Sequence, residues 1–137
     1  YAVPKAGQAP PRVLVVDDDP MVREMLEDSL GRAGYAVRTA AEGESGLTQV
    51  RQEVPDLMVL DLLMPGLSGF DVLQRIREDR RTADLPVIVY TAAQLTASDR
   101  ERLSAQMAAL VPKAGQIDAS LLQEVARHAP PPASRPA

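Results

Sequence analysis

The chain has 137 residues, of which 45% are hydrophobic and 25% charged, a profile typical of one soluble globular domain and not of a disordered or fibrous chain. Its formal net charge is -4 and only 3% of its residues are aromatic, so we expect no direct contact with nucleic acid. It has no cysteine, which excludes disulfides and thiolate chemistry, and no run of the roughly 20 apolar residues that a bilayer span needs, so we expect no membrane contact.

Both ends of the chain are rich in proline and alanine, as linkers are. We therefore assign residues 1–11 to a linker or to the remnant of a preceding domain. Residues 12–129 form the folded domain, and residues 130–137 form a disordered tail.

The first expected strand covers residues 12–16, because RVLVV is a short, β-branched and apolar run that suits a strand buried on both faces. Asp19 can then cap a helix whose first residue is Pro20, and Gly34 ends that helix. Its apolar residues recur at helical spacing, and they are Val22, Met25, Leu26, Leu30 and Ala33.

The middle of the chain continues the alternation of strand and helix. Residues 35–39 predict a second strand, residues 44–52 a helix, and residues 56–60 a third, fully buried strand. Ser68, with Asp71 three residues later, predicts the start of the next helix.

The last third of the chain predicts two more strands. Residues 87–90 form the fourth strand, Thr96 and Asp99 begin a short helix, and residues 109–111 form a fifth strand with a weaker pattern. A final amphipathic helix then begins at Asp118 or Ser120.

Five strands alternating with five helices predict an α/β fold, a doubly wound five-stranded parallel sheet in the order 2-1-3-4-5 with helices on both faces. In such a sheet the ligand site lies outside the carboxyl ends of the strands. Asp17 and Asp18 follow the first strand, Asp61 the third, Thr91 the fourth and Lys113 the fifth, so we expect these five side chains to converge.

Three crowded carboxylates repel one another, which makes physical sense if a divalent cation lies among them. Oxygen ligands favour Mg²⁺. Magnesium can bridge a phosphoryl oxygen while a lysine ammonium and a threonine hydroxyl hold the other oxygens, and a carboxylate is then the nucleophile.

These residues resemble the motifs of response-regulator receiver domains of the CheY-like superfamily, with its flavodoxin-like fold, over roughly residues 12–127. The resemblance rests on VVDDD at 15–19, DLLMP at 61–65 with Gly69, YTA at 90–92, and Lys113.

The resemblance implies that Asp61 is the phosphorylated residue. Asp17, Asp18 and Asp61 would hold Mg²⁺ together with the backbone carbonyl of Leu63. Thr91 and Lys113 would contact the phosphoryl group, and the small Ala92 would leave room for it.

The same resemblance implies a role in two-component signalling or a phosphorelay in the bacterial cytoplasm. The donor would be a histidine kinase or a histidine phosphotransfer domain, and the chain would be a phosphoacceptor and not a free-standing enzyme. The face near strands four and five could form a homodimer. Residues 95–103, 113–115 and 121–122 resemble receivers attached to hybrid histidine kinases, and YAVP at 1–4 is similar to the closing strand of a kinase ATP-binding domain.

Two positions depart from the family pattern, and two others bear on the lifetime of the acyl phosphate. Pro112 precedes Lys113 where the family commonly has a proline after its lysine, and Leu110 stands where the family often has an aromatic switch residue. Leu63 and Ala93 flank the reaction and cannot orient a water, so we predict slow self-dephosphorylation.

Two other functions stay open. Asp17 and Asp19 form an Asp-x-Asp after a buried strand, as in phosphatases of the haloacid-dehalogenase kind, but that reading leaves residues 61–65 without a role. An interaction module that keeps the fold without phosphorylation is the second alternative.

Overall fold

The computed structural model describes residues 9–113 and 119–131. The strands of this part are β1 (Arg12–Val16), β2 (Ala36–Ala40), β3 (Leu57–Leu60), β4 (Val87–Thr91) and β5 (Ala109–Pro112). The helices are α1 (Pro20–Arg32), α2 (Gly43–Gln52), α3 (Gly69–Glu78), α4 (Ala97–Ser104) and α5 (Ala119–His128). The expected helix start at Asp118, the altered residues 114–115, most of the N-terminal linker and residues 132–137 lie outside the described residues.

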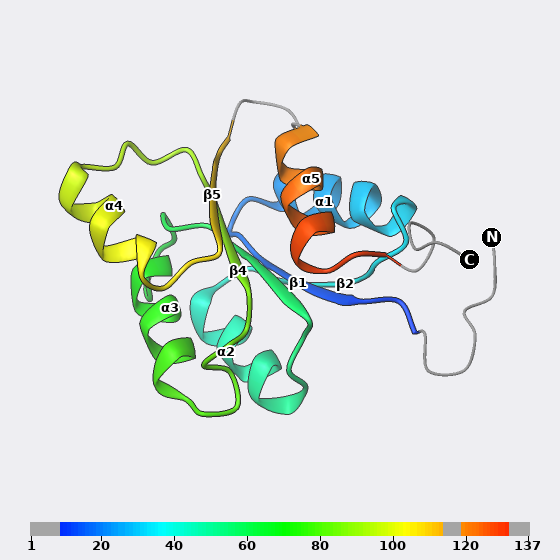
Figure 1. Ribbon diagram of the computed structural model, residues 1–137, viewed down its shortest axis with the longest axis horizontal. Helices are drawn as coiled ribbons and strands as arrows, with labels where there is room; N and C mark the ends of the chain where they lie inside the picture. Colours follow the sequence, from blue (N-terminus) through cyan, green and yellow to red (C-terminus); the bar gives the residue numbers. More distant parts are fainter. Residues whose placement is uncertain (1–8, 114–118, 132–137) are drawn as a thin grey trace.

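The sheet is parallel throughout and has the order β2-β1-β3-β4-β5, which confirms the predicted topology. At the carboxyl end of β1, Val16 is paired with Ala40 of β2 on one side and with Leu60 of β3 on the other. Figure 1 shows α1 and α5 on one face of the sheet and α2, α3 and α4 on the other. The fold therefore has three layers with the sheet in the middle.

The central strands are apolar on both faces because each face is covered by helices. In β1, Leu14 and Val16 pack into the core beneath α2, α3 and α4, whereas Val13 and Val15 pack into the core beneath α1 and α5. This arrangement explains why the strands are continuous apolar runs and do not alternate with polar residues.

Side-chain caps fix where three helices begin, as the sequence predicts. Asp19 accepts a hydrogen bond from the Met21 N–H (2.9 Å), Ser68 caps α3, and Thr96 forms a capping box with Asp99. The prediction that Ala33 belongs to the apolar stripe of α1 is wrong, since α1 ends at Arg32 and Ala33 is exposed.

The chain leaves α5 along the α1 side of the fold. Pro131, which the sequence analysis assigned to the C-terminal tail, is buried. A Cβ built on Gly34 would lie 3.4 Å from the Pro131 Cβ, so these two segments are in close contact. Gly34 has a φ of 102°, a conformation that favours glycine in the turn between α1 and β2.

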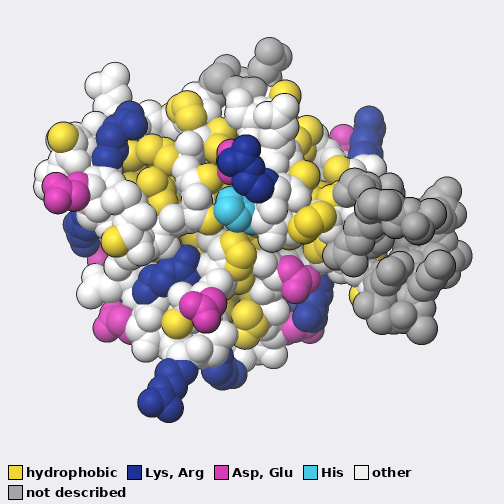
Figure 2. Space-filling view, viewed as in Figure 1, with side chains coloured by type: hydrophobic (Ala, Val, Ile, Leu, Met, Phe, Trp, Pro, Cys, Tyr) yellow, Lys and Arg dark blue, Asp and Glu magenta, His cyan; other side chains and the backbone are white. Residues whose placement is uncertain are grey.

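No helix among the described residues has both the length and the apolar character that crossing a bilayer requires. On the face that Figure 2 presents, lysine and arginine side chains are scattered among acidic and hydrophobic ones.

Candidate functional site

Two buried carboxylates lie at the carboxyl ends of neighbouring strands. Asp17 follows β1 and its N–H donates to the Ala40 carbonyl (3.1 Å), while Asp61 follows β3 and its N–H donates to the Val16 carbonyl (3.0 Å). Asp17 is 2% exposed and Asp61 is 5% exposed. The sheet ladder thus extends one residue past each strand and holds both acids at its edge.

Asp18 completes an acidic cluster with these two residues. One carboxylate oxygen from each of Asp17, Asp18 and Asp61 lies within 4.8 Å of the others, and Asp18 is exposed to solvent. Oxygen-only donors of this kind suit a hard divalent cation such as Mg²⁺. The donor set therefore fits the predicted magnesium, with one side open to water.

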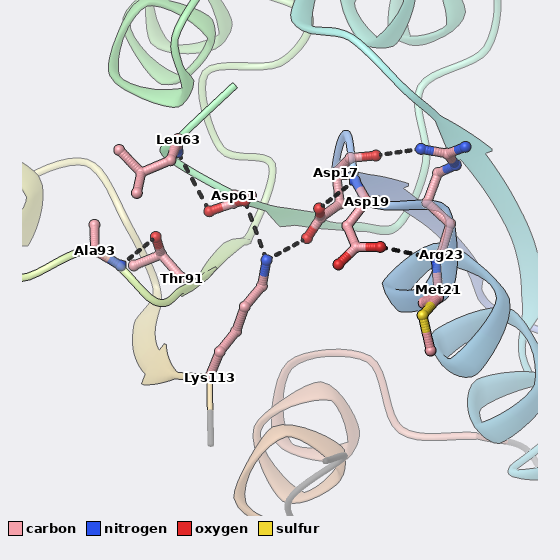
Figure 3. A network of polar contacts seen from close by, with 9 residues as sticks. All are labelled: Asp17, Asp19, Met21, Arg23, Asp61, Leu63, Thr91, Ala93 and Lys113. Carbon is pink, nitrogen blue, oxygen red and sulfur yellow. Dashed lines mark hydrogen bonds and ion pairs between the residues drawn. The ribbon is translucent and has the colours of Figure 1, made fainter. Parts of the chain in front are cut away.

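Lys113 is the cation that the fold itself brings to the cluster. Its Nζ lies 2.7 Å from Asp17 Oδ2 and 3.1 Å from Asp61 Oδ2, and Figure 3 shows the side chain reaching from the end of β5 toward both acids. The Lys113 N–H donates to the Thr91 carbonyl (2.9 Å), which fixes the base of the side chain. One lysine and three aspartates give the cluster a formal charge of about -2 when all four side chains are ionised.

The environment shifts the pKa of two of these groups upward. Burial raises the pKa of the Asp17 carboxyl, and hydrogen bonds from Lys113 and from the Asp19 N–H offset that effect only in part. Burial acts to lower the pKa of Lys113, but its hydrogen bonds and charge interactions with Asp17 and Asp61 outweigh burial and raise it. Ionising Asp17 therefore costs stability relative to its protonated form, whereas the fold favours the charged form of Lys113.

Thr91 is the last residue of β4, and Ala92 follows it. Thr91 is 2% exposed, and its hydroxyl oxygen accepts a hydrogen bond from the Ala93 N–H (3.1 Å). Figure 3 shows Thr91 and Ala93 together on the opposite side of Asp61 from Asp17. Ala92 is exposed. The structure thus brings Thr91 to the same edge as Asp61 and Lys113, as the strand order predicts.

The loop after β3 bends sharply beside Asp61. The Leu63 N–H donates to Asp61 Oδ1 (3.3 Å), the Gly69 N–H donates to the Leu62 carbonyl (3.1 Å), and Gly66 has a φ of 78°. The Leu63 side chain is 59% exposed. The loop therefore orients the Asp61 carboxylate and presents an apolar side chain at the rim of the site.

Two contacts at the site were missed by the sequence analysis. Arg23 donates from Nη1 to the Asp17 backbone carbonyl (2.8 Å), and Lys113 Nζ lies over the Tyr90 ring, 5.7 Å from its centroid. The position of Arg23, one helical turn after the Asp19 cap, could have indicated the first contact. No sequence signal points to the second, because it depends on the path of the lysine side chain.

Asp19 and His128 have structural roles. Asp19 is exposed and caps α1, as predicted. His128 lies in the last turn of α5 with Nε2 3.6 Å from Glu124 Oε2.

The chain is similar to proteins of one known family. The family model described as "Response regulator receiver domain" matches residues 13–126. The DNA-binding dual master transcriptional regulator RpaA of Synechocystis sp. is 46% identical over 82 residues, which cover 60% of this chain and 34% of RpaA. The chain thus spans about a third of the length of this curated relative.

Solved structures match over most of their length. Response regulator protein TrrA of Thermotoga maritima, in complex with Mg²⁺ and BeF, is 36% identical with a TM-score of 0.76, covering 86% of this chain and 98% of that one. A match with 35% identity and a TM-score of 0.74 comes from the complex of histidine kinase ThkA with TrrA, and it covers 86% of this chain and 97% of that one.

Proposed function

The chain belongs to the response regulator receiver domain family, whose model matches residues 13–126, and we propose that its Asp61 accepts a phosphoryl group with Mg²⁺ bound beside it. The observation that carries the proposal is the placement of Asp61. Its carboxylate is buried at the end of β3, within the acidic cluster and 3.1 Å from the Lys113 ammonium. A carboxylate held in this way is suited to act as a nucleophile.

Asp17, Asp18 and Asp61 would hold the magnesium, with the Leu63 carbonyl as a further ligand. When bound, magnesium supplies positive charge that offsets the repulsion between the acids and the oxygens of an incoming phosphoryl group. This coordination is supported by the oxygen-only donor set of the site and by the Mg²⁺ and BeF in the Thermotoga TrrA structure.

In the proposed reaction an oxygen of Asp61 attacks phosphorus. The new O–P bond forms while the P–N bond to the donor imidazole breaks, and the imidazole keeps the bonding electron pair. Lys113 and Thr91 contact the phosphoryl oxygens, and the single Cβ of Ala92 leaves space for them. Phosphorylation then adds charge at the edge of the sheet and shifts the domain between two conformations.

A histidine kinase or a histidine phosphotransfer domain is the proposed donor, and the complex of ThkA with TrrA supports this class of partner. We place the exchange in the bacterial cytoplasm. The face near β4 and β5 would serve as the output surface and as the surface through which the chain forms a homodimer. We propose no direct contact between these 137 residues and nucleic acid.

The identity of the parent protein is a separate part of the proposal. Residues 95–103 and 113–115 resemble receivers of hybrid histidine kinases, whereas the matching curated relative RpaA is a DNA-binding transcriptional regulator. The similarity to RpaA favours a transcriptional regulator as the parent protein. Sequencing the complete gene decides between them, since a hybrid kinase would carry a kinase domain and a regulator a DNA-binding domain.

The phosphatase alternative is not favoured. Its motif needs Asp19 at the reaction centre, but Asp19 is exposed and its side chain caps α1. The unphosphorylated module predicts no covalent product at all.

The experiment that tests this proposal identifies which aspartate becomes phosphorylated. The chain is incubated with acetyl phosphate and Mg²⁺ and treated with borohydride, which reduces an aspartyl phosphate to homoserine. We expect homoserine at position 61 in peptide mass spectra. Homoserine at another aspartate, or turnover of p-nitrophenyl phosphate without a covalent product, would contradict the proposal.

A further inference from the structure

The ring of Tyr90 lies directly beneath the charged end of Lys113. Tyr90 is the fourth residue of β4 and is 4% exposed, packed in the core between the sheet and helices α1 and α5. The same core cluster contains Val59, Ile88 and Val111. A ring so enclosed has little freedom to move, so it offers a fixed surface to the site.

Lys113 reaches the acids by passing over that surface. Its backbone is fixed to the Thr91 carbonyl, and its Nζ lies 5.7 Å from the Tyr90 ring centroid. The neighbours of the ammonium therefore include the carboxylates of Asp17 and Asp61 and the face of the ring. The Lys113 side chain is only 16% exposed, which leaves water a small share of its surroundings.

We infer that Tyr90 is a positioning residue, whose ring face holds the Lys113 ammonium beside Asp61 during phosphoryl transfer. This inference rests on the proposed function. The ring quadrupole attracts a cation without taking up a hydrogen bond, so it leaves the three donors of the ammonium for oxygens.

The ring matters because the two carboxylates near the ammonium change during the reaction. Asp61 loses its charge when it forms the acyl phosphate, and Asp17 is a proposed ligand of magnesium. The face of the Tyr90 ring, by contrast, keeps its charge distribution in every state. A flexible lysine stem loses less entropy on binding phosphoryl oxygens when its end is already held.

The competing explanation is that Tyr90 only fills the core, and two variants separate the alternatives. Tyr90→Phe keeps the ring, whereas Tyr90→Leu keeps an apolar side chain without the ring. Calorimetry measures the Kd of each protein for Mg²⁺ alone and for fluoroberyllate, a phosphoryl analogue, in saturating Mg²⁺. We expect Tyr90→Phe to match the wild type in both titrations.

For Tyr90→Leu we expect fluoroberyllate to bind about fivefold more weakly, with no loss of magnesium affinity. A merely structural defect would weaken both ligands together, and that result, or unchanged fluoroberyllate binding, would overturn the inference. If the wild type itself fails to bind fluoroberyllate, the proposed function is overturned and this inference with it.

A series of fluorinated rings at position 90 varies the ring quadrupole without changing how the core packs. Phenylalanine with one, two or three ring fluorines at position 90 keeps the shape of the ring but weakens its quadrupole stepwise. We expect fluoroberyllate affinity to fall with each fluorine while the Kd for Mg²⁺ stays constant. A flat series would overturn the inference.

Discussion

Lys113 Nζ lies 2.7 Å from Asp17 Oδ2, although the two residues follow strands that are separated in the sheet by β3 and β4. The contact spans the carboxyl edge of the sheet and joins the lysine proposed to hold phosphate to an acid proposed to hold magnesium. Lys113 and a bound divalent cation would therefore compete for the carboxylate of Asp17.

Replacing Lys113 by methionine tests this competition, since methionine keeps much of the apolar stem and removes the charge. We expect Mg²⁺ to bind at least about threefold more tightly, because a nearby positive charge is lost. Phosphorylation by acetyl phosphate should slow by about tenfold or more. Calorimetry and intact mass measure the two effects. Arg32→Met, on the exposed surface of α1, is the control, and weaker magnesium binding in Lys113→Met would contradict the account.

Asp17 should lower the stability of the magnesium-free protein at neutral pH. Its pKa is raised by burial, so the folded state holds the Asp17 proton more tightly than the unfolded state does. Stability from this group is therefore greatest below its ordinary pKa and is lost as pH rises through the raised value.

Asp17→Asn should accordingly raise the free energy of unfolding at pH 7 by about 1 kcal/mol and flatten its dependence on pH. The same change should weaken Mg²⁺ binding. Urea titrations without magnesium at pH 4 and pH 7 measure the first effect, with the exposed Asp28→Asn as control. A less stable Asp17→Asn at pH 7 would show that its pairing with Lys113 outweighs burial.

The Leu63 side chain should protect the acyl phosphate from water. It is 59% exposed beside Asp61 and has no group that could orient a nucleophilic water. We expect a phosphoryl lifetime of minutes or longer, shortened about tenfold in Leu63→Gln. Release of inorganic phosphate measures the rate, and Met21→Gln, at another exposed apolar residue, should leave it unchanged. A wild-type lifetime of only seconds would refute this prediction.

Gly69 should be essential for the loop that carries Leu63. A Cβ at Gly69 would lie 2.3 Å from the Asp61 carbonyl oxygen and 2.6 Å from the Leu62 Cα, so backbone would have to move. We expect Gly69→Ala to lower the free energy of unfolding by about 3 kcal/mol. Gly31→Ala, where a Cβ meets nothing within 4 Å, should raise it by about 0.5 kcal/mol. Chemical denaturation compares the two, and equal stability would contradict the argument.

The sequence predicted the order of elements because each central strand is a continuous apolar run and three helices begin at recognisable caps. The strands at 12–16 and 57–60 lie within one residue of their expected bounds. Strand order alone was enough to bring Asp17, Asp61 and Lys113 to one edge. The C-terminal end of the buried face of α1 was harder to predict, because Ala33 was expected on that face but lies exposed after the helix.

Side-chain paths across the site could not be predicted from the order of residues. The pattern places Lys113 after β5, but the distances from its Nζ to Asp17 (2.7 Å) and to Asp61 (3.1 Å) depend on rotamers set by packing. The same holds for its passage over Tyr90, because a core tyrosine and a site lysine carry no joint signal in the sequence. Such contacts emerge only once both are fixed in space.

The most direct test of the central claim is the intact mass of the chain after incubation with acetyl phosphate, with and without Mg²⁺. The account predicts that the wild type and Asp28→Asn each gain one phosphoryl group that requires magnesium, and that Asp61→Asn gains none. A gain in Asp61→Asn equal to that of the wild type would contradict the account. So would no gain in a wild type whose magnesium binding has been established by calorimetry.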